Sequence, residues 1–279
     1  MDYKAQSCAS CGSGALKLIS HKLTDGNVFY TYRCEACGET FSTETAYLAR
    51  KAREEKRAAM EQAAKQKKAV PAAPSGTLDA PEIYRRNRNS VVELTADKGD
   101  CVGSGTGMVL PGGYVLTNAH VVFSKEKENA TRVQAADSLI GVTADKRRFA
   151  FDIVYADVRR DMALIVSDDL AAPAVTFADG DVTIGEKVYA IGNSKGQGIC
   201  MLDGIVSDRE RFISGERYIM YSAPTVGGNS GGPLFNAHGE VIGMVTLGQK
   251  DGSLMNYAIP TGVLKAFLLE AEEKEGIVI

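Results

Sequence analysis

The sequence has no run of about 18 apolar residues, the length at which a helix can cross a bilayer, so no membrane span is predicted. The opening stretch, Met1 to Cys8, lacks the apolar centre of a secretory signal. No internal repeat of fixed period is present, which argues against a solenoid. From the missing signal and the cysteine spacing described below, we expect a cytoplasmic protein without membrane partners.

A strong charge of one sign is also missing, since the net charge of the 279 residues is −3. Residues 1–70 hold 12 Lys/Arg against 8 Asp/Glu, and residues 71–279 hold 20 against 27. The larger part is therefore not an obvious nucleic-acid binder, and the N-terminal part is mildly basic. A hydrophobic content of 44% is enough for at least one core, in one large or two modest domains.

Composition divides the chain into four segments. Residues 1–42 form a small cysteine-containing module with two expected strands, Leu16–Ile19 and Val28–Arg33. Residues 43–69 are rich in Ala, Glu, Lys and Arg without Gly or Pro, and this predicts an exposed helical spacer. Residues 70–81 hold three prolines and a glycine and predict a linker, and residues 82–279 form the main domain.

The main domain is mainly β. Short β-rich runs between turn signals are typical of an all-β barrel or sandwich. The expected strands are Ser90–Thr95, Gly107–Leu110, Tyr114–Thr117, Phe149–Tyr155, Ala163–Ser167, Lys187–Ile191, Gly204–Ser207, Tyr218–Ser222, Gly232–Phe235 and Val241–Thr246. Apolar residues at helical spacing from Pro260 to Glu273 predict a terminal helix.

Four of the six cysteines form two Cys-x-x-Cys pairs, Cys8 with Cys11 and Cys34 with Cys37. Two such pairs separated by one hairpin fit a tetrahedral tetrathiolate Zn²⁺ site, and this module resembles a zinc ribbon. We expect the zinc to be structural, because four protein ligands leave no position open for catalysis. A redox dithiol pair is the alternative. No cofactor is expected for catalysis.

The remaining cysteines, Cys101 and Cys200, lie beside apolar residues and are expected to be buried free thiols. The binding partner of the cysteine module is left open. Most basic residues of this region lie on the helical spacer between glutamates, which indicates a solvated helix. A more specific hypothesis is that the module recruits a protein substrate or partner, and nucleic acid is a further candidate partner.

A serine surrounded by glycines follows the predicted strand Tyr218–Ser222, in the run Gly227-Gly228-Asn229-Ser230-Gly231-Gly232-Pro233-Leu234. Glycine costs backbone entropy and is used where the chain needs unusual φ or close approach. Ser230 is therefore a candidate nucleophile, with the backbone N–H groups of Gly228 and Ser230 as a candidate oxyanion hole. A plain glycine-rich turn is the alternative.

A base and an orienting carboxylate are also available. His120 follows an apolar strand, whereas the other two histidines, His21 and His238, lie in polar or turn contexts. Asp161 directly precedes the apolar run Met162–Val166, at a position suited to accept from an imidazole Nδ1–H. Asp152 and Asp157 are rival carboxylates that are also compatible with plain surface charge.

Six blocks in the order His, Asp, Ser resemble the protease domain of HtrA/DegP-type serine proteases, a group with the trypsin fold. The resemblance covers residues 84–270. The blocks are Ser90–Leu94, Gly103–Gly107, Thr117–Val122, Asp161–Ile165, Gly228–Leu234 and Asn256–Pro260. The resemblance implies two six-stranded β-barrels with a triad of His120, Asp161 and Ser230 in the cleft between them. Ser222–Gly227 departs from the family's pattern where substrate specificity is set, so the preferred substrate residue is not transferred.

The sequence therefore predicts a serine endopeptidase that acts on protein or peptide substrates, with a zinc ribbon for recruitment or regulation. Because oxyanion loops in this family can be misassembled until subunits associate, a homo-oligomer is compatible with this prediction. The alternative from another class is a catalytically silent trypsin-fold scaffold that only binds its partners.

Overall fold

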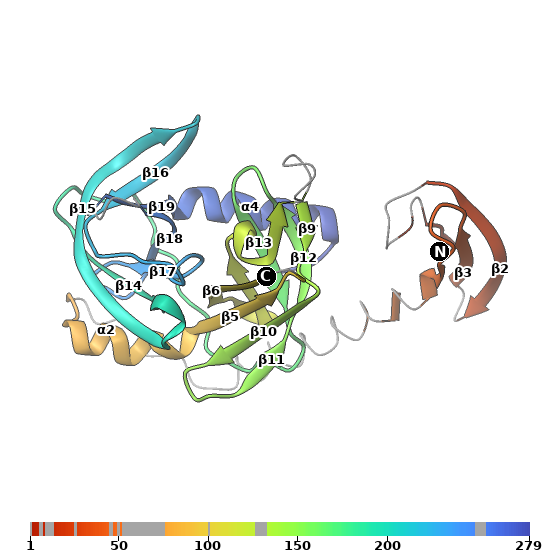
Figure 1. Cartoon of the computed structure of the whole chain (residues 1–279), viewed down its shortest axis with the longest axis horizontal. Helices are drawn as coiled ribbons and strands as arrows, with labels where there is room; N and C mark the ends of the chain where they lie inside the picture. Colours follow the sequence, from red (N-terminus) through yellow and green to blue (C-terminus); the bar gives the residue numbers. More distant parts are fainter. Residues whose placement is uncertain are drawn as a thin grey trace. The chain divides into compact units, whose positions relative to one another are not determined.

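The chain folds into two compact units, Met1–Val70 and Pro71–Ile279, which are described separately (Figure 1). The structure is a computed structural model, and it describes residues 2–5, 8, 14–24, 27–44, 47–48, 51, 76–99, 101–125, 133–248 and 255–279. Most of the predicted helical spacer at 43–69 lies outside these residues. Among them, no helix is both long and apolar enough to cross a membrane.

The N-terminal unit is a small sheet. Strands β2 (Leu16–Thr24) and β3 (Asn27–Cys34) form its antiparallel centre and confirm the two expected strands. Two short strands flank β3, with β1 (Asp2–Tyr3) parallel and β4 (Thr40–Ser42) antiparallel to it. A row of ring contacts, including Tyr32 on Phe41 at 6.0 Å, supports one face of this sheet. Its apolar core is small, so a cross-link or metal would add substantially to its stability.

The second unit opens with helix α2 (Ala80–Asn87), which the sequence analysis missed because it assigned residues up to 81 to the linker. Asp79 caps the helix, accepting the Glu82 backbone N–H at 2.9 Å. Asp-x-x-Glu is a capping signature, and Pro81 is tolerated in the first turn because its missing N–H has no helical partner there. The helix is fixed by Ile83, which is fully buried.

The first half of this unit is a seven-stranded sheet in the order β11-β10-β5-β6-β7-β13-β12. Its edge strands, β11 and β12, are consecutive in the chain and separated only by Phe151, so the sheet is curved and one end of each edge strand lies close to the other. The strand bounds are β5 (Val91–Asp97), β6 (Val102–Val109), β7 (Tyr114–Thr117), β10 (Ser138–Thr143), β11 (Arg148–Ala150), β12 (Asp152–Asp157) and β13 (Met162–Val166). Strands β8 (Phe123–Lys125) and β9 (Val133–Ala135) form a separate two-stranded antiparallel sheet.

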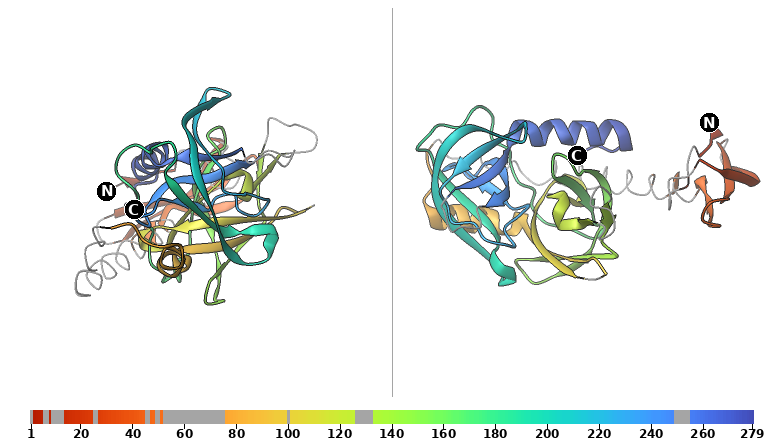
Figure 2. Two further views of the ribbon diagram at one scale, coloured as in Figure 1. Left: turned by 90° about the vertical axis from the view of Figure 1, so that its left-hand side faces the viewer. Right: turned by 45° about the horizontal axis from the view of Figure 1, so that its top comes forward.

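The second half is a closed barrel in the order β14-β15-β16-β19-β18-β17 (Figure 1). The long hairpin of β15 and β16 extends beyond the barrel wall (Figure 2). The strand bounds are β14 (Lys187–Asn193), β15 (Ile199–Ile213), β16 (Glu216–Tyr221), β17 (Pro233–Phe235), β18 (Val241–Gly248) and β19 (Asn256–Pro260). These two sheets and the terminal helix α4 (Thr261–Glu275) confirm the trypsin-like fold class.

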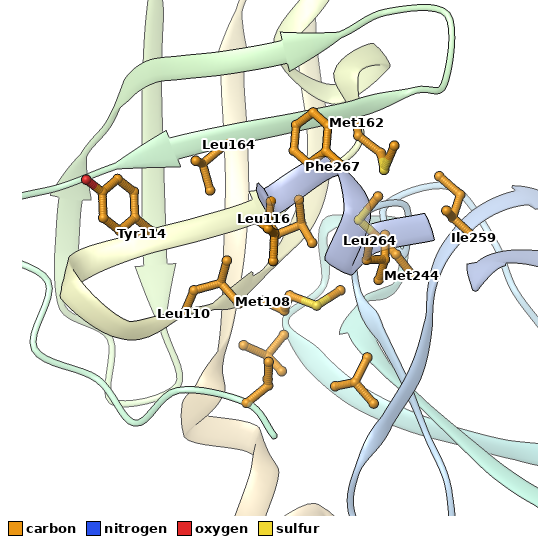
Figure 3. Close-up of a cluster of buried hydrophobic side chains, with 14 of the residues drawn as sticks. Met108, Leu110, Tyr114, Leu116, Met162, Leu164, Met244, Ile259, Leu264 and Phe267 are labelled. Carbon is orange, nitrogen blue, oxygen red and sulfur yellow. The ribbon is translucent and has the colours of Figure 1, made fainter. Parts of the chain in front are cut away.

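Strands β7 and β13 are buried on both faces, which explains their uninterrupted apolar sequences. On β7, Val115 faces the interior of the first sheet, whereas Tyr114 and Leu116 face a second apolar cluster between the two halves. Met162 and Leu164 of β13 join the same second cluster (Figure 3). Because successive side chains of a strand point to opposite faces, β7 contributes to two apolar cores.

Helix α4 closes the space between the two halves with its apolar face. Leu264 and Phe267 are fully buried beside Met108 and Leu116 of the first sheet and Met244 of the barrel (Figure 3). Each such side chain contributes about 1.5–3 kcal/mol when it is fully removed from water. This packing holds the two halves in a fixed relation, which the site described below requires.

The expected burial of the two free thiols in the main domain is wrong. Cys101 is exposed and Cys200 is half-buried, although both are free. Apolar neighbours in sequence did not predict burial because Cys101 lies just before β6 begins, where the chain is at the surface.

An ion-pair group ties α4 to the first sheet. Arg160 donates to both carboxylate oxygens of Glu270, at 2.9 and 2.6 Å, and to Asp157 at 2.6 Å. These hydrogen bonds lower the pKa of Glu270. Burial raises the pKa of Asp157, but the bonds from Arg160 outweigh it and the pKa falls. A carboxylate with a lowered pKa stabilises the fold above its unfolded pKa, and this stability is lost as the pH falls through its folded pKa.

Replacing Glu270 with glutamine is therefore expected to destabilise the main domain by about 1 kcal/mol at pH 7, or about 2–4 °C in melting temperature. The difference from wild type should begin to shrink as the pH falls below about 4.3, the ordinary pKa of glutamate, and should vanish only below the lowered pKa that Glu270 has in the folded protein. Thermal melts followed by circular dichroism at several pH values measure both effects. Glu273→Gln, at an exposed position of the same helix, is the matched control, and an equal loss in both variants would contradict the assignment.

Candidate active site

Strand register brings His120 and Asp161 to one edge of the first sheet. Strands β7 and β13 are antiparallel, with Thr117 opposite Ala163. The end of β7 therefore lies beside the start of β13, and the residues just outside this pair face one another. These are the two stretches in which the sequence analysis placed its base and its carboxylate.

His120 lies on a single helical turn, α3 (Ala119–Val122), that follows β7. Val121 and Val122 are buried, which leaves the His120 side chain 49% exposed on the outer side of the turn. Lys98 holds the end of the turn by donating its Nζ to the carbonyl oxygens of His120 at 2.7 Å and Phe123 at 2.9 Å. Burial lowers the pKa of this ammonium.

Asp161 accepts three kinds of donor. The His120 Nδ1 lies 2.8 Å from Oδ2 and 3.0 Å from Oδ1, and the His120 backbone N–H donates to Oδ1 at 2.9 Å. Thr246 donates its hydroxyl to Oδ2 at 2.7 Å. Asp161 also has φ +58°, a left-handed conformation that a non-glycine residue adopts rarely and that is found often at functional sites. The Asn118 side-chain amide donates to the Asp161 carbonyl at 2.9 Å and supports this conformation.

Ser230 comes from the second barrel, in the turn before β17. Its hydroxyl donates to the carbonyl oxygen of Thr246 in a long hydrogen bond of 3.5 Å. Thr246 thus contacts both Ser230, through its carbonyl, and Asp161, through its hydroxyl. Among the described residues, no hydrogen bond joins the Ser230 hydroxyl to the His120 ring. Such bonds are often long or absent without substrate and tighten when it binds.

Two glycines beside Ser230 are required by close backbone approach. Gly228 has φ +97°, and a Cβ there would lie 2.1 Å from the Asn193 carbonyl oxygen. Gly231 has φ +85°, and its Cβ would lie 2.1 Å from the Thr106 carbonyl oxygen. Any larger residue would therefore push the loop away from both halves, and this explains the glycine-rich sequence around Ser230.

The backbone N–H groups of Gly228 and Ser230 have no acceptor in the part of the chain that the structure describes. Neighbouring amides do have one, since Asn229 N–H donates to Val226 at 3.2 Å and Gly231 N–H donates to Val245 at 2.8 Å. These two amides, on either side of Asn229, are the donors that were predicted from the sequence for an oxyanion hole.

The rival residues lie elsewhere. Asp157 is bound to Arg160, and Asp152 is an exposed residue at the start of β12. The backbone N–H of His238 donates to Asn236 in the turn between β17 and β18, and His21 lies in the N-terminal unit. Sequence reasoning missed Lys98, Thr106 and Thr246. A lysine and two threonines within strands carry no local signal of a site.

In the N-terminal unit, three cysteines lie together. The sulfur atoms of Cys8, Cys34 and Cys37 are all within 4.8 Å of one another, with Cys8 and Cys34 buried. The Cys8 and Cys37 sulfurs are 3.8 Å apart. The fourth predicted ligand, Cys11, lies outside the described residues. Gly38, after the second pair, has φ +78°, a left-handed conformation that favours glycine.

Known proteins that are similar in sequence to this chain are named as serine endoproteases. A probable periplasmic serine endoprotease DegP-like of Pseudomonas putida is 32% identical over 197 residues, or 66% of this chain and 39% of the relative. Its counterpart in Halomonas elongata is 34% identical over 167 residues, or 57% of this chain and 33% of the relative. The chain thus matches about two fifths or less of these relatives' length. These relatives are named periplasmic, which contradicts the cytoplasmic location expected for this chain.

The location was predicted wrongly because it rested on the missing signal and on cysteine spacing, and neither identifies a compartment.

The solved structures that resemble the chain are also proteases. The HtrA-type protease AlgW with tripeptide has a TM-score of 0.62 and 30% identity, and the match covers 72% of this chain and 65% of that one. The serine endoprotease from Yersinia pestis has a TM-score of 0.61 and 25% identity over 74% and 69% of the two chains.

A family model described as a trypsin-like peptidase domain matches residues 105–244, which include His120, Asp161 and Ser230. The resemblance to HtrA/DegP-type proteases and the serine-peptidase class expected from the sequence are confirmed at this level. The chain belongs to the family of trypsin-like peptidase domains.

Proposed function

We propose that the main domain is a serine endopeptidase in which Ser230 is the nucleophile, His120 the general base and Asp161 the orienting carboxylate. One observation carries the proposal: Asp161 accepts from both the His120 ring and Thr246, and Thr246 in turn accepts from Ser230. Three residues distant in sequence are thereby connected where the two halves meet. The family membership supports the same reaction.

In the first step, the Ser230 Oγ attacks the carbonyl carbon of the scissile peptide bond while the His120 Nε2 accepts the hydroxyl proton. Asp161 holds the Nδ1 proton and so keeps Nε2 free to act as the base. The carbonyl oxygen becomes an oxyanion, which the Gly228 and Ser230 N–H groups stabilise. His120 then returns the proton to the leaving amine as the C–N bond breaks. Water, activated by His120, hydrolyses the acyl-enzyme and restores the serine.

The substrate is a protein or peptide, since a trypsin-like cleft accepts an extended chain. The test is release of new amino termini from unfolded casein by the purified full chain. Cleavage that requires Ser230 supports the peptidase. Binding of casein without any cleavage would instead favour a silent scaffold, the alternative from another functional class.

We also propose a structural Zn²⁺ site formed by Cys8, Cys11, Cys34 and Cys37. The geometry of the three described thiols supports it, because Zn–S bonds of about 2.3 Å in a tetrahedron place sulfurs about 3.8 Å apart, and Cys8 and Cys37 are separated by 3.8 Å. Four thiolates would hold the metal and fix the two turns relative to the sheet. The unit would then serve in recruitment or regulation rather than in catalysis.

Purified full chain is expected to contain about one zinc per molecule, because binding energy and folding energy are coupled in so small a unit. Cys34→Ser should lower the zinc content below about 0.2 per molecule, whereas Cys200→Ser, in the main domain, should leave it unchanged. Elemental analysis and thiol titration measure this. Zinc-free protein whose four N-terminal thiols are reactive, or joined as disulfides, would contradict the site.

A further inference from the structure

Thr106, in β6 of the first sheet, forms hydrogen bonds with all of its polar groups, and its N–H and hydroxyl bond to residues of the second half. Its backbone N–H donates to the Ser230 carbonyl at 2.8 Å. Its hydroxyl donates to the Gly228 carbonyl at 2.7 Å and accepts the Asn193 N–H at 2.9 Å. Its own carbonyl accepts the Thr117 hydroxyl at 2.7 Å. The side chain is fully buried, with 0% exposure.

These bonds fix the peptide planes around Gly228. The Gly227 carbonyl is held by the Lys195 N–H at 2.7 Å. Because C=O and N–H point in opposite directions in a trans peptide, this bond directs the Gly228 N–H away from Lys195. The next carbonyl, that of Gly228, is held by the Thr106 hydroxyl. The two anchors together impose the φ of +97° at Gly228, a value that only glycine adopts readily.

Rotation of the Gly227–Gly228 peptide would turn its N–H toward the Lys195 N–H and remove the donor from the oxyanion position. Such a rotation would also bring the φ of Gly228 toward ordinary negative values, which any residue can adopt. The Thr106 hydroxyl opposes this change by holding the peptide that follows. It is the only side chain among the described residues that donates to the backbone of the segment Gly227–Ser230.

We propose that Thr106 is a positioning residue for the oxyanion hole: its buried hydroxyl holds Gly228 in the orientation that directs the Gly228 N–H at the reacting carbonyl. The inference rests on the proposed serine-peptidase function. It assigns a contribution to transition-state stabilisation to a residue of the first sheet that lies outside the triad. The effect should be on the chemical step rather than on substrate binding.

The test compares Thr106→Val, which keeps the shape and removes the hydroxyl, with Thr106→Ser, which keeps the hydroxyl. Thr106→Val is expected to lower kcat for a peptide substrate about 10- to 100-fold, somewhat less than the loss of an oxyanion donor itself. KM should change less than about threefold, since ground-state binding is retained. Thr106→Ser should restore most of kcat. Thr261→Val is the matched control, because its buried hydroxyl also donates to a backbone carbonyl, at 2.7 Å, but in α4.

Circular dichroism melts establish that each variant is folded at the assay temperature. Wild-type protein without Ser230-dependent hydrolysis would refute the proposed function and this inference with it. Active wild type together with an unchanged kcat in folded Thr106→Val would refute only the role of Thr106. If Thr106→Val does not fold, the Thr106→Ser variant tests the proposal. A large loss of kcat in folded Thr106→Ser would show that a hydroxyl at this position is not sufficient to maintain the oxyanion hole, and would refute the role of Thr106.

Discussion

Replacing Ser230 with alanine is expected to lower the rate of casein hydrolysis about 10⁶-fold, the scale observed when a serine peptidase loses its nucleophile. The Ser230 hydroxyl donates to the carbonyl of Thr246, whose own hydroxyl donates to Asp161, the proposed partner of His120. The residual rate should come from binding and the oxyanion donors alone. Release of amino groups, measured with an amine-reactive fluorophore, gives the rate.

The matched control is Ser138→Ala, an exposed serine at the start of β10. This variant should retain wild-type activity, and both variants should melt at the wild-type temperature. Hydrolysis that persists in Ser230→Ala would mean that a different group, or a contaminating protease, carries the activity.

Replacing Asp161 with asparagine is expected to lower kcat about 10⁴-fold, the loss known for the equivalent change in a trypsin-type triad. Asp161 accepts from the His120 N–H, the His120 ring and Thr246, so an amide cannot satisfy all three. If the amide oxygen keeps the backbone N–H, its NH₂ group faces Nδ1. The ring must then carry its proton on Nε2, where it can no longer act as the base.

Asp152→Asn is the control for this experiment, because Asp152 is a rival carboxylate that is exposed on β12. Steady-state kinetics with a peptide substrate measure kcat for both variants. A large loss in Asp152→Asn with little change in Asp161→Asn would reverse the assignment of the orienting carboxylate.

Much of this organisation follows from the sequence. The run Tyr114–Thr117 is found as strand β7 with the predicted bounds, because apolar residues on both faces can be buried only in the interior of the domain. His120 and Asp161 could be proposed because each follows or precedes such a strand. Their contact could not be derived from local pattern, since it depends on the antiparallel pairing of β7 with β13.

Other features could not be predicted because their causes are distant in sequence. Thr106, Asn193 and Gly228 meet only when the two halves pack, and each looks ordinary in its own segment. The capping pattern of helix α2, Asp79 with Glu82, is present in the sequence, but the three nearby prolines favoured a linker instead of a helix. The cellular compartment was predicted wrongly because the N-terminal residues and the cysteine spacing, on which the prediction rested, do not determine where a protein is located.

The central claim, that Ser230 is an activated nucleophile, is tested most directly with a fluorophosphonate, which phosphonylates an activated serine and displaces fluoride. The account predicts one adduct per folded chain, located at Ser230 by peptide mass spectrometry and absent from Ser230→Ala. An adduct that persists in Ser230→Ala, or folded protein that casein tests show to be active but that gains no adduct at Ser230, would contradict it.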